Sequence, residues 1–259
     1  MTKLLCAGAF AAACALAGGA HAVSVDVELQ LLVDASGSIS DSEFSLQTDG
    51  YESSFRSSEV QDAIAAGALG NIAAQLIFFS SASEQAIGVD WFLIDSADSA
   101  NAFADAIAGT DRPFFGLTAI GNALDFGRPL FDDNGFEGTS LVQDVSGDGV
   151  NTAGIDPAVA RDLSLADGIE INALAVGDAA LVSFFESSVI GGPDAFVEQA
   201  DDFDGFEAAI TQKLVAEISD PGGPTLPPVS AVPIPAPFAM LLAAIGILPL
   251  VRSRRSAAA

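Results

Sequence analysis

Short apolar runs and helical patterns alternate through the middle of the chain. The segment 25–33 alternates at first and becomes fully apolar at Leu31-Leu32-Val33, which is typical of a strand covered on both faces. In 96–108, apolar residues recur every three or four positions, as on one face of a helix. Strands are predicted at residues 25–33, 72–79, 85–94, 140–145, 169–176 and 195–199. Helices are predicted at residues 41–55, 60–66, 96–108, 119–131, 157–166, 182–189 and 203–218.

This order of elements predicts an α/β domain with a Rossmann-like arrangement: a mostly parallel central sheet with helices on both faces. The short loop 80–84 cannot hold the crossover that parallel strands need, so its two flanking strands should form a hairpin with one antiparallel edge strand. Ser40 or Asp41 is expected to cap the first helix. Asp156, followed by Pro157 at the first helical position, should begin the helix 157–166.

The beginning of the chain has the features of a signal peptide. Residues 1–22 carry Lys3, then an apolar run, then the small-x-small sequence Ala20-His21-Ala22, so we expect export and cleavage. A buried N-terminal helix is the alternative. Both cysteines lie in this segment, and Cys14 has Ala11 three positions earlier, where a lipoprotein signal would have an aliphatic residue such as leucine. The mature chain would therefore contain no cysteine, which excludes disulfides and cysteine nucleophiles.

The other end predicts attachment to a membrane. A Pro/Gly-rich linker at 221–233 precedes an apolar stretch at 234–251, and its 18 residues are near the minimum for a membrane-spanning helix. The basic tail 252–259 favours a cytoplasmic C-terminus. The sequence Val-Pro-Ile-Pro-Ala-Pro from Val232, together with the apolar stretch and the arginines, resembles PEP-CTERM sorting signals of the Val-Pro-Leu-Pro-Ala variant.

That resemblance implies processing by a sorting peptidase of the exosortase type. The alternative is a plain C-terminal anchor. In both cases we expect an exported protein at the cell envelope or surface of a Gram-negative bacterium, anchored in the membrane at least before any processing.

The domain at 23–220 is strongly acidic. It contains all 35 acidic residues and only five basic ones, which gives it a formal charge of −30. Such a domain repels phosphate, so we exclude a nucleic-acid partner. The charge suits divalent cations, basic partners or solubility in saline surroundings. The only histidine, His21, would leave with the signal peptide, which excludes Ser-His and Cys-His catalysis.

A polar loop follows the first strand at Asp34-Ala35-Ser36-Gly37-Ser38. Loops after the carboxyl ends of parallel strands gather at one edge of a sheet, where ligands bind. Asp34 supplies a carboxylate, and Ser36 and Ser38 supply hydroxyls at alternate positions. Gly37 allows a tight curl between them. These hard oxygen ligands suit Mg²⁺, Mn²⁺ or Ca²⁺, and we expect Mg²⁺ first.

This pattern resembles the metal-ion-dependent adhesion site (MIDAS) of von Willebrand A domains, Asp-x-Ser-x-Ser. The stretch Gly116-Leu117-Thr118 is similar to the family's Gly-Gly-Thr motif, with leucine in place of the second glycine. The segment 144–149, Asp-Val-Ser-Gly-Asp-Gly, lies where the family has Thr-Asp-Gly. The resemblance therefore implies the von Willebrand A fold, and it adds the Thr118 hydroxyl and an aspartate of the third segment as metal ligands.

Asp148 aligns with the family's aspartate, at the end of the central strand. Asp144 lies deeper on the same face of that strand, where it would accept a hydrogen bond from a hydroxyl or backbone group, or would replace Asp148 as the ligand. The segment also resembles a proteobacterial subfamily of unknown function with this six-residue signature, and Arg112-Pro-Phe adds to that likeness. An EF-hand calcium loop starting at Asp144 is a weaker alternative, because its twelfth position is Ile155.

The resemblance implies a binding module and not an enzyme. In such sites neutral hydroxyls hold the cation, which then accepts a carboxylate from a partner protein. The alternatives are a metal-dependent hydrolase and a metal-free structural protein of the envelope.

Overall fold

The structure is a computed structural model that describes residues 22–219. The chain divides into two units, Met1–Thr225 and Leu226–Ala259. The predicted signal peptide (up to residue 21), the linker 221–233, the apolar stretch 234–251 and the basic tail 252–259 lie outside the described residues. Within residues 22–219, none of the helices has the length and apolar character needed to cross a membrane.

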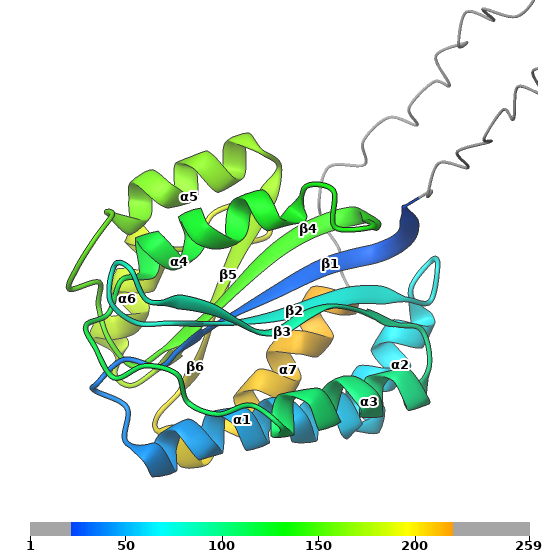
Figure 1. The fold of residues 1–259 in the computed structure, drawn as a ribbon, viewed down its shortest axis with the longest axis horizontal. Coiled ribbons are helices and arrows are strands. Elements are labelled where there is room, and N and C mark those ends of the chain that lie inside the picture. The colour runs from blue at the N-terminus through cyan, green and yellow to red at the C-terminus, as the bar shows by residue number, and fades with distance from the viewer. Residues whose placement is uncertain (1–21, 220–259) are drawn as a thin grey trace, which may run out of the picture. The chain divides into compact units, whose positions relative to one another are not determined.

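A six-stranded sheet forms the centre of the domain (Figure 1). Its strands, in spatial order, are β3 (Gln85–Ile94), β2 (Ile72–Phe79), β1 (Val23–Asp34), β4 (Phe136–Gly147), β5 (Ile169–Val176) and β6 (Val197–Ala200). β3 is antiparallel to β2, and every other neighbouring pair is parallel. The predicted fold class, including the single antiparallel edge strand, is confirmed.

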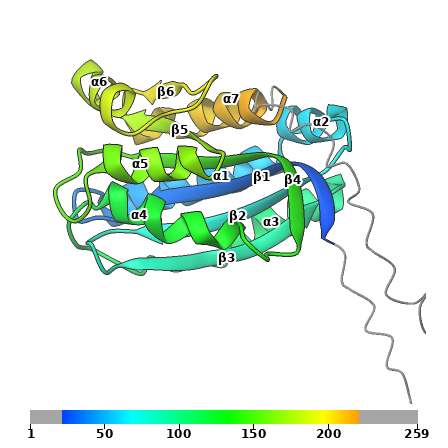
Figure 2. The same ribbon diagram turned by 90° about the horizontal axis from the view of Figure 1, so that it is seen from above.

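Helices cover both faces of this sheet (Figure 2). One layer contains α1 (Asp41–Arg56), α2 (Ser58–Ala66), α3 (Ala97–Ala108) and α7 (Phe206–Ser219). The opposite layer contains α4 (Ile120–Gly127), α5 (Pro157–Ala166) and α6 (Ala179–Ser188). Two short 3₁₀ helices, η1 (Arg128–Phe131) and η2 (Phe203–Gly205), complete the described part of the chain.

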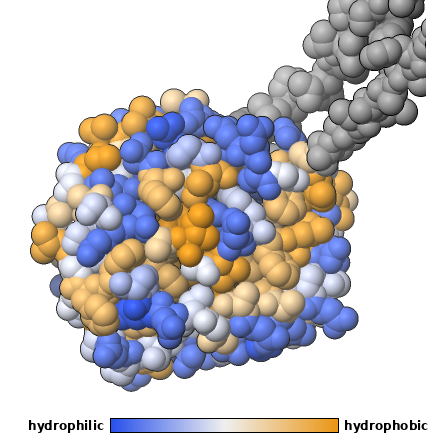
Figure 3. Space-filling model, viewed as in Figure 1, coloured by the Kyte–Doolittle hydropathy of each residue, from blue (hydrophilic) through white to orange (hydrophobic). Residues whose placement is uncertain are grey.

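The central strand β1 supplies a buried core to each layer. Leu29, Leu31 and Val33 pack in the core under α1, α3 and α7, whereas Leu32 packs in the core under α4, α5 and α6. This is the alternation that a strand imposes on its side chains. The surface on the β3 side shows apolar patches among hydrophilic residues (Figure 3).

The structure differs from the sequence prediction at several element ends, and three of these differences have a clear local cause. β4 begins at Phe136, earlier than predicted, because its first residues pair with the start of β1. The helix predicted at 119–131 ends at Gly127 and continues as η1, since Pro129 lacks the N–H that an α-helix needs. α6 begins earlier than predicted, where the Asp178 side chain accepts hydrogen bonds from the backbone N–H groups of Ala180 and Leu181.

The helix caps follow the prediction more closely. Ser40 caps α1 and forms a capping box with Glu43, so Ser40 and not Asp41 is the N-cap residue. Asp156 caps α5 ahead of Pro157. The Ser40 cap, two residues after Ser38, fixes where α1 begins and thereby limits the length of the loop that follows β1.

Candidate metal site

The candidate site lies at the carboxyl edge of the parallel sheet, where β1 and β4 end side by side. Val33 of β1 is opposite Ser146 of β4 in the register of the two strands. Asp34 is the last residue of β1, and Asp148 directly follows β4. The adjacency of these two strands brings together two carboxylates that are far apart in the sequence.

Asp34 is fully buried, and only one of its two carboxylate oxygens has a hydrogen-bond partner among the described residues. Its Oδ1 accepts a hydrogen bond of 2.7 Å from the Ser36 backbone N–H. Its Oδ2 has no hydrogen-bond partner among the described residues. A Cβ on Gly147 would lie 3.0 Å from that oxygen, so glycine leaves room beside it. Burial raises the pKa of Asp34 to about 7, although the hydrogen bonds from Ser36 oppose the rise.

A chain of hydroxyl contacts joins the other predicted ligands. Thr118 Oγ1 donates to Ser36 Oγ at 3.2 Å, and Ser36 Oγ lies 3.1 Å from Ser38 Oγ. Ser38 Oγ donates to Asp148 Oδ1 at 2.7 Å. The structure thus brings together all five of Asp34, Ser36, Ser38, Thr118 and Asp148.

Asp148 is more accessible than Asp34, being half-buried. Burial raises the pKa of its carboxyl group, the hydrogen bond from Ser38 lowers it, and the charge of Glu43 raises it. Gly147 and Gly149 flank it, and a Cβ on Gly149 would meet only Thr118 Oγ1, at 3.9 Å. The Asp34 carboxylate is therefore buried at the edge of the sheet, whereas the Asp148 carboxylate is partly accessible to solvent.

Backbone hydrogen bonds tie the three loops of the site to one another. The Gly37 N–H donates to the Gly116 carbonyl at 2.8 Å. A Cβ on Gly37 would lie 2.8 Å from the Phe115 carbonyl oxygen, so this close approach requires glycine. The Thr152 N–H donates to the Thr118 carbonyl at 2.8 Å, which links the loop after β4 to the loop before α4. The site is a single hydrogen-bonded unit.

Arg112 contacts the loop after β1 and the start of α1, a supporting role that the sequence did not indicate. Its Nη2 donates to the carbonyl oxygens of Ala35 at 3.2 Å and Ser36 at 2.7 Å, and its Nη1 contacts Asp41 Oδ1 at 3.0 Å. The guanidinium also lies 4.1 Å from the centre of the Phe115 ring. Its charge lowers the pKa of Asp34. Two sequence features marked Arg112: its rarity, since the domain has only five basic residues, and the likeness of Arg112-Pro-Phe to the subfamily.

Asp144 lies apart from the metal-site oxygens. It is fully buried within β4, and its Oδ1 lies 2.6 Å from Lys213 Nζ of α7. Lys213 also pairs with Glu217 one turn later in α7. The main partner of Asp144 is thus an ammonium group and not the hydroxyl or backbone group that we predicted. Asp144 and Ser146 lie inside strand β4, so this segment is not an EF-hand loop.

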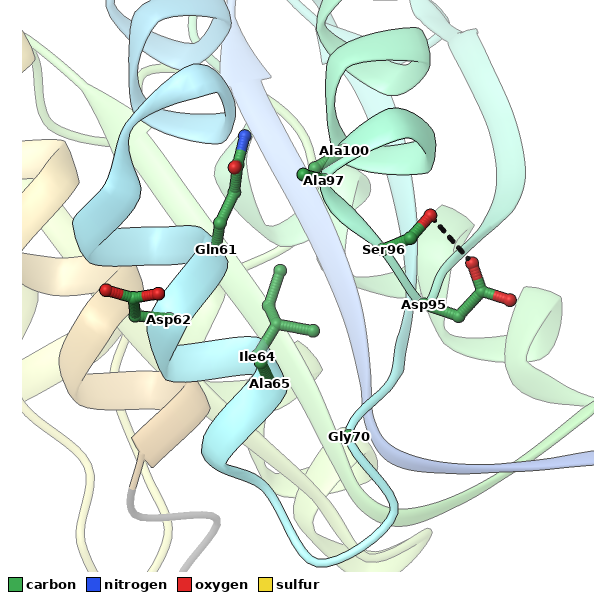
Figure 4. Close-up of a pocket in the computed structure, with 9 residues that line it drawn as sticks. All are labelled: Gln61, Asp62, Ile64, Ala65, Gly70, Asp95, Ser96, Ala97 and Ala100. Atoms are coloured by element: carbon green, nitrogen blue, oxygen red, sulfur yellow. Dashed lines mark hydrogen bonds between the residues drawn. The ribbon is translucent and has the colours of Figure 1, made fainter.

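A small cavity of about 180 Å³ lies elsewhere, between α2 and the start of α3 (Figure 4). Its inner wall includes Ile64, Ala97 and Ala100. The carboxylates of Asp62 and Asp95 point away from the space between these residues, and Asp95 accepts a hydrogen bond from Ser96 Oγ. Without converging polar groups, this cavity is a poor candidate for catalysis or specific binding.

The oxygen atoms of the candidate site fit a hard divalent cation. Among residues 22–219, no three His, Cys, Asp or Glu side chains are placed to hold a metal ion together. The possible donors at this site are two carboxylates and three hydroxyls. Neighbouring oxygens in an octahedral magnesium shell lie about 3 Å apart, given Mg–O distances of about 2.0–2.1 Å. The contacts of 2.7, 3.1 and 3.2 Å are hydrogen bonds, and they hold these oxygens close enough together to bind one ion. The unpartnered Asp34 Oδ2 supplies a further acceptor.

Solved structures share the fold of this domain. Proximal thread matrix protein 1 from the mussel byssus matches with a TM-score of 0.57 and 14% identity, over 76% of this chain and 48% of that one. A further structure of that protein, described with a zinc-occupied MIDAS motif, matches with a TM-score of 0.54 and 14% identity, over 77% of this chain and 48% of that one. The pilus adhesin SpaC from Lactobacillus rhamnosus GG matches with a TM-score of 0.54 and 18% identity, over 77% of this chain and 32% of that one.

These neighbours have von Willebrand A-like folds, and at such identities they establish the fold alone. The chain spans about half the length, or less, of the solved structures that it matches. No curated protein matches it. A family model described as "Protein of unknown function (DUF1194)" matches residues 24–222. The chain therefore belongs to the DUF1194 family, with a von Willebrand A-like fold.

Proposed function

We propose that this chain binds a protein partner through a divalent cation held by Asp34, Ser36, Ser38, Thr118 and Asp148. The observation that supports this most is the continuous set of contacts from Thr118 to Asp148, beside the unpartnered Asp34 Oδ2. When bound, the cation would supply an electrophilic position for a partner's carboxylate, because only two of the five protein donors are anionic. Mg²⁺ suits these donors best, with Mn²⁺ and Ca²⁺ next. Zn²⁺ also belongs among the ions to test, given the similar structure described with zinc.

Binding explains the donor set better than catalysis does. The chain's only histidine and both of its cysteines lie in residues 1–22, outside the domain. The hydroxyls of Ser36, Ser38 and Thr118 contact one another and Asp148, so they serve to hold a cation without adding charge. We therefore propose that the protein is not an enzyme. Metal-dependent hydrolysis of an ester, phosphate or peptide, lost in Asp148→Ala, would contradict this proposal.

The test is thermal unfolding of the full-length chain in mild detergent, with and without Mg²⁺. A ligand at a hundred times its Kd stabilises the folded state by about 2.7 kcal/mol, which is roughly 5–10 °C in Tm for a domain of this size. We expect Asp34→Ala to abolish the rise. Asp49→Ala removes an exposed carboxylate of α1 and should leave the rise unchanged. An equal Mg²⁺ response in the wild type and Asp34→Ala would refute the site.

We further propose that the protein is exported and held at the cell envelope of a Gram-negative bacterium by residues 234–251. The signal-like segment 1–22 and the apolar stretch followed by arginines support this proposal. A sorting peptidase of the exosortase type would act on the tail. Removal of residues 232–259 should move the protein from the membrane fraction to the soluble fraction.

A further inference from the structure

Exposed apolar side chains lie on the loops that carry two of the candidate metal ligands. Among residues 22–219, nine large apolar side chains are exposed, and three of them lie on the two loops that carry Thr118 and Asp148. Phe115 is 63% exposed and Leu117 58%, just before Thr118. Val150 is 45% exposed, two residues after Asp148. Exposed apolar groups gathered beside a polar site mark an interaction surface more often than single scattered ones do.

These side chains are presented by backbone that is held in place. The Gly116 N–H donates to Ser80 Oγ at 2.8 Å, and the Leu117 N–H donates to Ser81 Oγ at 2.9 Å. The Phe115 ring rests against the Arg112 guanidinium, itself fixed to the metal loop. A rigid loop binds its ligand without first losing much conformational entropy.

Carboxylates also lie close to the site. Asp41, at the start of α1, has a side chain that is 86% exposed. Glu43 lies near enough to raise the pKa of Asp148. These carboxylates repel a partner's carboxylate, and at physiological salt such repulsion extends over about 8–10 Å. Asp41 is paired with Arg112, whose guanidinium also lies against Phe115, so part of this negative charge is compensated. Apolar contacts with Phe115, Leu117 and Val150 would offset the remaining repulsion of a partner's carboxylate.

We propose that Phe115, Leu117 and Val150 form an apolar rim that receives a large aliphatic or aromatic side chain adjacent to the carboxylate-bearing residue of a protein partner. This inference rests on the proposed function, because it concerns the partner of the same site. The occupant is a separate protein and not a second copy of the chain, since two domains of charge −30, each with five basic and 35 acidic residues, repel each other. The tail cannot supply an acidic side chain either, because residues 221–259 contain no Asp or Glu.

Short immobilised peptides with one aspartate provide the test. One peptide has Leu and Phe beside the aspartate, the second has serines there, and the third has asparagine in place of the aspartate between Leu and Phe. Binding of the full-length chain in mild detergent is measured by surface plasmon resonance, with Mg²⁺ and with EDTA. We expect the first peptide to bind on the order of tenfold more tightly than the second, because two apolar side chains leave water. The asparagine peptide and EDTA should both abolish binding.

Leu117→Ser should reduce the preference for the first peptide towards equality while keeping the Mg²⁺-dependent rise in Tm, and Val150→Ser should do the same. Leu69→Ser is the matched control, because Leu69 is 51% exposed and precedes β2 at the opposite edge of the sheet. It should keep the full preference. The Tm response in each variant shows that the protein is folded and its metal site intact.

The outcomes separate the two proposals. A wild-type chain that is stabilised by Mg²⁺ but binds both aspartate peptides equally would overturn the apolar rim alone. A chain without any Mg²⁺ response would overturn the proposed function. Mg²⁺-dependent dimerisation in light scattering, lost in Asp34→Ala, would make a second copy the occupant and overturn the inference of a separate partner.

Discussion

At the scale of single residues, Arg112 connects the loops of the candidate site. Its side chain is almost buried and contacts the carbonyls of Ala35 and Ser36, the carboxylate of Asp41 and the ring of Phe115. A planar guanidinium can make these contacts at once, whereas a lysine ammonium on a flexible stem cannot. Arg112 therefore orients the backbone from which Ser36 and Ser38 extend.

We expect Arg112→Lys to weaken the metal site without changing its charge. The lost hydrogen bonds should lower the free energy of unfolding by about 1–3 kcal/mol. Loss of a group that orients ligands should raise the Mg²⁺ concentration for half-maximal stabilisation by roughly tenfold or more. Urea unfolding and a Tm titration with Mg²⁺ measure the two effects. Arg128→Lys is the control, because its pairs with Asp125 and Asp167 lie at the surface. An unchanged Mg²⁺ midpoint in Arg112→Lys would contradict the positioning role.

Part of the candidate site was predictable from local sequence and part was not. Asp34, Ser36 and Ser38 follow one apolar strand, so their proximity is a property of a five-residue segment. Thr118 and Asp148 lie 82 and 110 positions from the serines that they contact, and only the family resemblance linked them to Asp34. The contacts of Arg112 depend on how its loop crosses the end of β1, which no local pattern records.

At the scale of elements, contacts between segments far apart in the sequence were also not predictable for α7. The sequence predicted a helix at 203–218, but not that Lys213 and Glu217 would be buried against Asp144 of β4. By contrast, local patterns predicted the observed bounds of four elements, because each is determined by its own apolar run and its flanking turn residues. These elements are β2, β3, α5 and β5. β4 was predicted too short, since Phe136 and its neighbours become a strand only by pairing with β1. Pairing between distant segments is what the sequence did not reveal.

The buried charges of α7 lead us to expect a pH-dependent stability. Burial raises the pKa of Glu217 to about 7 from 4.5; the charge of Asp144 adds to this, and Lys213 opposes it. The Glu217 carboxyl group therefore binds its proton more tightly in the folded protein than in the unfolded chain. The free energy of unfolding contributed by this group is largest below about pH 4.5 and falls as the pH rises towards 7. The total change is on the order of 3 kcal/mol at most.

Glu217→Gln retains the shape of the side chain and removes its titration. We expect this variant to lose part of the decline in urea-unfolding free energy between pH 5 and pH 7, because Asp34, whose pKa is also raised to about 7, keeps its own contribution. Glu207→Gln, an exposed residue in the first turn of α7, should retain the wild-type decline. Parallel pH profiles for Glu217→Gln and the wild type would show that Asp144 and Lys213, and not Glu217, control any pH dependence of this cluster.

At the scale of the whole molecule, charge and hydrophobicity are separated along the chain. The acidic domain carries a charge of −30, from five basic and 35 acidic residues, and anionic lipid surfaces repel it. Residues 234–251 contain no charged side chain, and Arg252, Arg254 and Arg255 follow them. Any stable attachment to a membrane should therefore depend on the C-terminal segment alone.

Removal of residues 232–259 should consequently release the protein completely, since the remaining domain has no attraction for anionic lipid. The measurement is the share of the protein in the membrane pellet after cell fractionation, repeated at high salt to remove proteins held only by charge. Deletion of residues 221–231 is the matched control: it shortens the linker but keeps the apolar stretch and the arginines, so the protein should stay in the pellet. If the chain without 232–259 still sediments with membranes at high salt, another part of the molecule holds it there, and the proposed anchor is wrong.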